Sequence, residues 1–139
     1  MCPFCDRDPS KPDDQPVKQN ELAQVFLSNP HKVPGHVLVM PKRHVEKPWE
    51  LTSEELQACF DLIFLIEQRF IGKLGDGIDL RQSYWPFKEQ DDLKVRHVLF
   101  HVVPRSKNDY LFQMADEKRA DLYADLDEVE GDAVARLLQ

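Results

Sequence analysis

The chain has 139 residues, of which 42% are hydrophobic and 31% charged, proportions typical of one soluble globular domain with a buried core. Its 25 acidic residues outnumber 18 basic ones, for a net charge of −7. Such a surface argues against general binding to nucleic acid or to an anionic membrane. The N-terminus lacks the apolar stretch of a signal peptide, and the most apolar run, 58–66, is too short to span a bilayer. We therefore expect a cytoplasmic protein that binds neither nucleic acid nor membranes.

The first half of the chain predicts two strands after an irregular lead-in. Residues 1–17 hold four of the ten prolines and are expected to be irregular. The apolar segment 22–27 predicts a strand. Pro30 and Pro34-Gly35 then predict a hairpin-like connection over 30–35, and the β-branched segment 36–40, stopped by Pro41, predicts the next strand.

A helix should follow. Thr52 or Ser53 can cap its first turn, where glutamates favour the positive end of the dipole, and it should end near residues 72–75. Apolar residues recur at spacings of three and four, which predicts the buried face: Leu56, Phe60, Ile63, Ile66 and Phe70. Cys59 lies on this apolar stripe and is interpreted as a core residue.

The second half predicts two more strands and a weaker helical region. Segments 78–84 and 95–103 have strand composition, with an acidic loop through Asp92 between them. From Asp116 onward the pattern is helical, with Gly131 as a break, and residues 106–139 form a partly helical tail without a motif. The order predicts a single α+β domain over 1–139, an antiparallel meander sheet with one long helix packed across it.

Two histidines share one face of the predicted strand 95–103. Side chains alternate along a strand, so Val98, Phe100 and Val102 point to one side. His97, Leu99 and His101 point to the other. This pattern fits either a site lined by imidazoles or two partly exposed histidines on an ordinary strand.

The three cysteines include a Cys2-x-x-Cys5 pair. On residues alone it could be a thiol redox pair, two independent thiols or half of a zinc site. His31 in the turn and His36 at the head of a strand are interpreted as structural.

Three segments in order resemble the histidine triad (HIT) family. Residues 34–45, PGHVLVMPKRHV, are similar to its PGHxLVxPKxH segment, a capped helix follows, and 97–105, HVLFHVVPR, are similar to the triad itself. The N-terminal Cys-x-x-Cys is also similar to that of many bacterial members. The resemblance covers about residues 2–105.

The resemblance implies a homodimer and attack on an α-phosphate by the middle histidine of the triad. In this sequence that position is Leu99, whose isobutyl group cannot act as a nucleophile. His97 and His101 lie two residues away, roughly 7 Å along a strand. We therefore expect the covalent mechanism to be lost or weak. The third histidine, His101, remains as a phosphate-binding and catalytic candidate.

The resemblance also implies further ligand-binding positions. Ser28 stands where many members carry an aspartate for the ribose, with Asn29 as the alternative. Gln82 is a candidate for phosphate binding, and Lys94 and Arg96 could supply positive charge. Both cations could equally be solvated side chains at a strand end.

A zinc site is implied by the same resemblance. In zinc-bearing members, the histidine of the PKxH segment and the first triad histidine complete the ligand set, and here these are His44 and His97. With Cys2 and Cys5 they would form a closed, structural Zn²⁺ site without an open catalytic position.

Together these features favour a histidine triad-like protein that binds a nucleotide or another phosphorylated small molecule, with weak or no nucleotidyl hydrolase or transferase activity. One alternative is an active hydrolase that uses His101 and water. Another is a zinc-stabilised scaffold with a vestigial pocket.

Overall fold

The computed structural model describes residues 2–91 and 94–139. Asp92, at the end of the predicted acidic loop, lies outside these ranges. The chain forms two compact units, residues 1–106 and 107–139, and each is described by itself.

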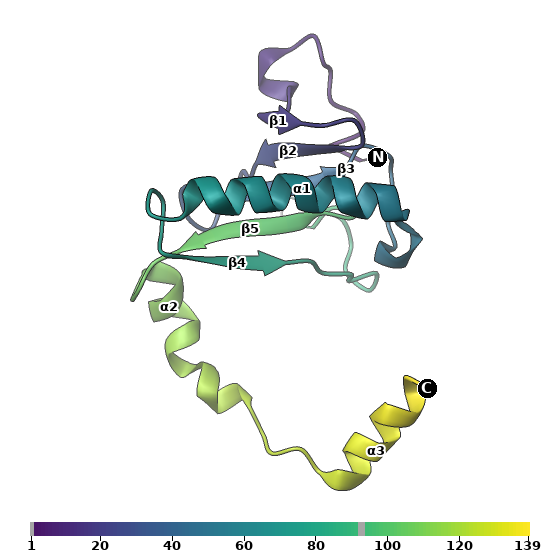
Figure 1. Cartoon of the computed structure of the whole chain (residues 1–139), viewed down its shortest axis with the longest axis vertical. Coiled ribbons are helices and arrows are strands. Elements are labelled where there is room, and N and C mark those ends of the chain that lie inside the picture. The colour runs from purple at the N-terminus through teal and green to yellow at the C-terminus, as the bar shows by residue number, and fades with distance from the viewer. Residues whose placement is uncertain (1, 92–93) are drawn as a thin grey trace. The chain divides into compact units, whose positions relative to one another are not determined.

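The first unit is an antiparallel sheet with a helix across one face (Figure 1). Its five strands lie in the order β1-β2-β3-β5-β4. They are β1 (Lys18–Gln19), β2 (Ala23–Leu27), β3 (Val37–Pro41), β4 (Gly77–Arg81) and β5 (Phe100–Arg105). Helix α1 (Ser53–Phe70) connects β3 to the edge strand β4, and short 3-10 turns occur at η1 (Pro12–Asp14) and η2 (Pro48–Glu50). The predicted α+β class is confirmed; the sheet departs from a simple meander only where β5 inserts between β3 and β4.

The main core lies between α1 and the sheet. Burying these side chains stabilises the fold by roughly 1.5–3 kcal/mol for each large aliphatic residue. The buried members are Ala23, Val25, Val37, Val39, Cys59, Leu62, Ile63, Ile66 and Val102. Cys59 is a core residue, as predicted. The predicted helix face was wrong at Leu56, which is 45% exposed: the buried stripe is centred on Cys59, Leu62 and Ile66, so Leu56 lies on the solvent side.

Helix α1 begins with the predicted cap. The Thr52 hydroxyl accepts a hydrogen bond from the Glu55 amide at 3.1 Å, and the Glu55 carboxylate accepts one from the Thr52 amide at 3.0 Å. Arg43 donates to the same carboxylate at 2.7 Å. This capping box satisfies two amides that a helix N-terminus leaves free. At the other end, Gly72 takes a positive φ of 80° just after the helix, which glycine adopts without strain.

The two later strands are shorter than their composition predicts. β4 ends at Arg81 and β5 begins at Phe100, so residues 82–84 and 95–99, predicted as strand, lie outside the sheet. In the later segment the Arg96 amide donates to the side-chain oxygen of Gln90, and the Val98 amide donates to the Val45 carbonyl, rather than to a neighbouring strand. β-branched composition alone does not supply the ladder partners that a strand needs.

The second unit is helical. It comprises α2 (Tyr110–Met114), η3 (Asp116–Leu122) and α3 (Glu128–Leu137). Asp109 and Asp127 cap α2 and α3 by accepting amide hydrogen bonds. The predicted break at Gly131 was wrong: the residue lies inside α3 and its amide donates to the Asp127 carbonyl at 2.9 Å. A single glycine costs a helix only about 1 kcal/mol. Across both described parts of the chain, no helix combines the length and apolar character needed to cross a membrane.

Candidate functional site

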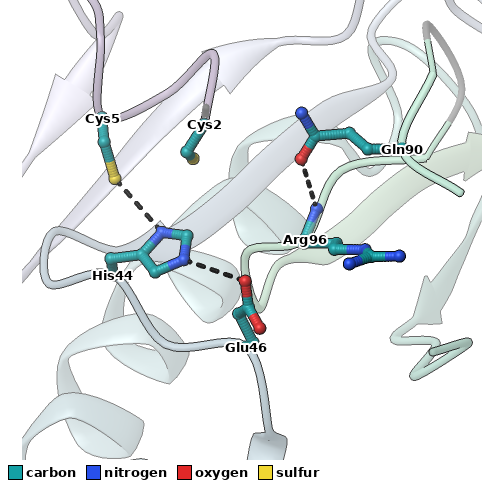
Figure 2. Close-up of a pocket in the computed structure, with 6 residues that line it drawn as sticks. All are labelled: Cys2, Cys5, His44, Glu46, Gln90 and Arg96. Atoms are coloured by element: carbon teal, nitrogen blue, oxygen red, sulfur yellow. Dashed lines mark hydrogen bonds and ion pairs between the residues drawn. The ribbon is translucent and has the colours of Figure 1, made fainter.

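Two thiols and two imidazoles converge from three distant segments. Cys2 and Cys5 come from the N-terminal lead-in, His44 from the loop after β3, and His97 from the segment before β5. Their sulfur and nitrogen atoms all lie within 4.8 Å of one another. The Sγ-to-Nδ1 separations are 3.4 Å for Cys2 to His97, 3.4 Å for Cys5 to His44 and 3.6 Å for Cys5 to His97. Figure 2 shows Cys2, Cys5 and His44 pointing toward a common centre.

The imidazoles in this cluster are oriented for a metal. The Nε2 atom of His97 donates to the Pro41 carbonyl at 2.9 Å, and Nε2 of His44 lies 3.3 Å from the Glu46 carboxylate. Both contacts leave the Nδ1 lone pairs directed toward the thiols, as in metal sites whose histidines are held from behind. Sulfur and nitrogen ligands of a tetrahedral zinc are about 3.6 Å apart, given its usual bond lengths. The observed separations therefore fit a Cys2His2 centre.

A second pair of histidines lies on the sheet face opposite α1. Nε2 of His36 and Nδ1 of His101 are 2.9 Å apart. The backbone amide of Lys32 donates to Nδ1 of His36 at 3.1 Å, so this nitrogen carries no proton. Neutral His36 must then carry its proton on Nε2 and donate it to Nδ1 of His101. Neutral His101 consequently presents an N–H on its remaining Nε2 atom.

Both imidazoles are neutral at physiological pH. Burial lowers the pKa of His36 to about 4, and the nearby charges of Lys32 and His31 act in the same direction. Burial, followed by His36, also lowers the pKa of His101 to about 4. Three cations contribute to this second shift: Lys32, Arg81 and Lys94. His101 is thus a hydrogen-bond donor in a locally positive field, on a chain whose net charge is negative.

The strand register places His101 in a row of side chains that runs across the sheet. Phe26 pairs with Leu38, Leu38 with His101, and His101 with Arg81, which brings these four residues onto one face. Leu99 packs against the buried cluster of Phe26, Leu38 and Met40. The predicted common face of Leu99 and His101 is therefore present, and its apolar part lies on the β2-β3 side of the histidine.

The other predicted ligand residues lie at different distances from this row. Lys94 contributes to the field at His101. Arg96 lines the pocket of about 470 Å³ beside the Cys-His cluster, together with Gln90 (Figure 2). The Ser28 hydroxyl donates to the Pro30 carbonyl at 2.7 Å. Gln82 follows the last residue of β4. For Ser28, Gln82 and Arg96, ligand binding stays a prediction.

Three site residues were missed by sequence reasoning. His36 was interpreted as structural, yet it holds the tautomer of His101. Lys32 acts through both its amide and its charge, and Arg81 faces His101 across the strand pair. The available signal was that Arg81 lies one residue before Gln82, near the end of the predicted strand. Only the strand register shows that Arg81 is the residue that faces His101.

Comparison with known proteins places this arrangement in a family. The family model of the HIT domain matches residues 10–108, more than half of the chain. This chain belongs to the HIT family. It is 30% identical over 135 residues to an uncharacterised HIT-like protein of Methanocaldococcus jannaschii, covering 94% of this chain and all of that one.

Two further proteins resemble this chain over part of its length. It is 35% identical over 99 residues to a bis(5′-adenosyl)-triphosphatase of Dictyostelium discoideum, which covers 65% of this chain but only 59% of that enzyme. A zinc-bound histidine triad family protein from Mycobacterium smegmatis superposes with a TM-score of 0.59 at 24% identity, over 80% of this chain and 79% of that one. The latter likeness supports the HIT fold.

Proposed function

We propose that this HIT protein binds a nucleotide or another phosphorylated small molecule at His101, with little or no nucleotidyl hydrolase or transferase activity. The observation that carries the proposal is the N–H that the His36 contact leaves on Nε2 of His101, in the positive field of Lys32, Arg81 and Lys94. A donor imidazole beside three cations is suited to phosphate oxygens. The similarity to a bis(5′-adenosyl)-triphosphatase of Dictyostelium discoideum supports a nucleotide-type ligand.

Weak chemistry follows from the same residues. Leu99 carries no lone pair, so a covalent intermediate cannot form at the middle position. His101 is a poor substitute, because its Nδ1 accepts a hydrogen bond from His36 and its Nε2 is protonated. At neutral pH the neutral ring has no additional proton to donate as a general acid.

The test pairs binding with activity. Adenosine and guanosine monophosphates are titrated by calorimetry into the parent protein and a His101→Ala variant. We expect at least one nucleotide to bind the parent and about tenfold weaker binding to the variant, because a charge-assisted hydrogen bond is worth about 1.5–3 kcal/mol. A nucleoside phosphoramidate is then assayed with the parent and with Leu99→His, and we expect turnover to rise in the latter.

Two outcomes would replace this proposal. Robust parent turnover that disappears in His101→Ala would favour an active hydrolase using His101 and water. Failure of every nucleotide and of inorganic phosphate to bind would favour the scaffold with a vestigial pocket.

We also propose that Cys2, Cys5, His44 and His97 hold a structural zinc ion. When bound, zinc would supply a cross-link between the lead-in and the sheet. The ligand separations and the contacts behind each imidazole support this, as does the zinc-bound Mycobacterium neighbour. Because the site needs reduced thiols, a cytoplasmic location is part of the proposal.

Metal analysis tests the zinc proposal. We expect about one zinc per purified chain and none in Cys2→Ser/Cys5→Ser. Chelation should lower the thermal unfolding midpoint of the parent and leave that variant unchanged. A metal-free parent with an unchanged midpoint would favour a plain thiol pair.

Dimerisation is proposed on two surface features. β4 is an edge strand with β5 as its neighbour in the sheet, and α1 exposes Leu56 and Phe64 by 45% and 54%. Light scattering should give twice the mass of one chain, and Phe64→Lys should shift it toward the monomer. A monomeric parent would contradict the proposal.

A further inference from the structure

The two thiols of the Cys-His cluster differ in their access to solvent. The Asp6 amide donates to the Cys2 carbonyl at 2.9 Å, which closes one turn over residues 2–6. This turn brings the Cys2 and Cys5 sulfur atoms within 4.8 Å of each other. Cys2 is only 8% exposed, whereas Cys5 is an exposed residue. A dissolved reagent therefore reaches Cys5 but not Cys2, although the two sulfur atoms are neighbours.

Cys5 also faces a pocket that carries charge of both signs. The pocket has a volume of about 470 Å³ and is lined by the two thiols, His44, Glu46, Gln90 and Arg96. Figure 2 shows the thiols on one side of it and Gln90 with Arg96 on the other. A guanidinium binds a carboxylate through two parallel hydrogen bonds, and the Glu46 carboxylate is suited to an ammonium group. The pocket therefore fits a small zwitterion whose carboxylate lies several bonds from the atom that meets Cys5.

The third cysteine provides an internal comparison. Cys59 is 0% exposed and lies in the main core between α1 and the sheet. Among the cysteines of the described chain, only the Cys2-Cys5 pair combines an accessible sulfur atom, a second thiol beside it and a polar pocket. A thiol reagent should therefore act on this pair alone.

We propose that Cys2 and Cys5 form a redox-active pair that reacts with a low-molecular-weight disulfide carrying a carboxylate, one half of which binds in this pocket. In the first step the Cys5 sulfur attacks the disulfide, a mixed disulfide forms at Cys5, and one small thiol leaves. In the second step the Cys2 sulfur attacks the Cys5 sulfur, the Cys2–Cys5 disulfide forms, and the second small thiol leaves. Two electrons pass from the cysteines to the reagent, and the two protons that the cysteines lose end on the released thiols.

This reaction goes beyond the proposed zinc function and does not need the ion. Cysteine binds a metal as the thiolate, so a Cys2–Cys5 disulfide leaves only His44 and His97 of the four ligands. Oxidation should therefore also lower the zinc content of a loaded chain. Disulfides of cytosolic proteins are usually transient and redox-sensing, which is the role that this pair would have.

The experiment uses oxidised glutathione as the probe and intact mass spectrometry as the readout. The reduced, zinc-loaded full-length parent is compared with Cys2→Ser and Cys5→Ser. We expect the parent to lose two hydrogens as the internal disulfide forms, and a colorimetric chelator should detect zinc release with the same time course. Cys2→Ser should gain one glutathionyl group that persists, because no second thiol resolves it. Cys5→Ser should stay unmodified.

The Arg96→Gln variant tests the pocket without altering a thiol. Its rate of reaction is measured with oxidised glutathione and with bis(2-hydroxyethyl) disulfide, which carries no carboxylate. The first rate should fall about tenfold, as expected for one lost charge-assisted hydrogen bond, and the second should not change. Arg69→Gln is the matched control, because it removes the same charge from an exposed position on α1, and it should leave both rates unchanged.

The contrary outcomes are distinct. Modification of Cys5→Ser at the rate of the parent, or a mixed disulfide that persists on the parent, overturns the redox pair. Equal rates of Arg96→Gln and the parent with oxidised glutathione, or equal slowing with both disulfides, overturns binding in the pocket. The zinc content of the purified protein is measured separately, so a metal-free chain contradicts the zinc proposal alone and leaves the mass readout in force.

Discussion

His36 and His101 are buried next to each other without carrying charge. Their pKa values of about 4 mean that the unfolded chain, whose histidines titrate near 6.5, binds more protons than the folded chain between pH 6.5 and 4. Protonation in this range therefore favours unfolding. The contribution of the pair is fully present above pH 6.5 and is lost as the pH falls toward 4.

We predict that the metal-free protein loses at least about 3 kcal/mol of unfolding free energy between pH 6.5 and 4, the value for one of the two histidines shifted to about 4. Urea unfolding at several pH values in the presence of chelator measures it, so that zinc loss does not contribute. In His36→Asn/His101→Asn the curve should be much shallower from pH 6.5 to 5, and the slope that remains should come from His97, whose pKa burial also lowers. Below pH 5, protonation of Glu55 lowers the unfolding free energy further, because Arg43 and the Thr52 amide hold the pKa of the Glu55 carboxylate at about 2 in the folded protein. If the unfolding free energy of the variant depended on pH as steeply as that of the parent, the loss could not be assigned to His36 and His101.

Helix α1 shows which parts of an element can be read from the sequence. Its start was predictable, because a cap is local: Thr52 and Glu55 are three positions apart. Its buried face was predicted less well at one position. Leu56 was expected in the core together with Cys59, but the packing of α1 on β2, β3 and β5 leaves it 45% exposed.

For the cap of α1 we predict unequal costs. Thr52→Ala should lower the unfolding free energy by about 1 kcal/mol. Glu55→Ala should cost about 2 kcal/mol, because it removes the buried acceptor of both the Thr52 amide and the Arg43 guanidinium. Glu54→Ala is the control, since Glu54 is an exposed neighbour in the same turn, and it should stay within about 0.5 kcal/mol. Equal effects of Glu54 and Glu55 substitutions in urea unfolding would contradict the role of the box.

At the scale of the whole molecule, the buried residues belong to the first unit. Every buried hydrophobic residue in the described parts of the chain lies at or before Val103. The second unit holds exposed apolar side chains, among them Tyr123, Leu126 and Leu137, which are 70%, 75% and 84% exposed. Its helices depend on caps and local hydrogen bonds.

We predict that residues 1–106 fold without the second unit. Circular dichroism should show cooperative unfolding, and the unfolding free energy in urea should lie within about 1 kcal/mol of the full chain, because burial of apolar area dominates stability. The isolated segment 107–139 should show little helix in water, since short helices are marginal alone. Aggregation or non-cooperative unfolding of the 1–106 fragment would show that the first unit requires the rest of the chain.

The candidate site was predictable where a resemblance covered it and not where it depends on register. Cys2, Cys5, His44 and His97 were predicted as one ligand set and are found within reach of a common ion. The sequence did not predict Arg81 and Lys32 as site residues, because only strand pairing and a loop conformation bring them near His101. Neither relation leaves a local pattern in the chain.

The ligand spacing of the Cys-His cluster also bears on the order of events during synthesis. Cys2 and His97 are 95 positions apart, and Cys5 and His44 are 39 apart. The two thiols leave the ribosome first, and His97 follows roughly 5–20 s later at ordinary elongation rates. In that interval the nascent thiols meet solution metals and oxidants without their imidazole partners. The full ligand set therefore cannot guide the earliest folding of the chain; it closes only after the first four strands and helix α1 have been made.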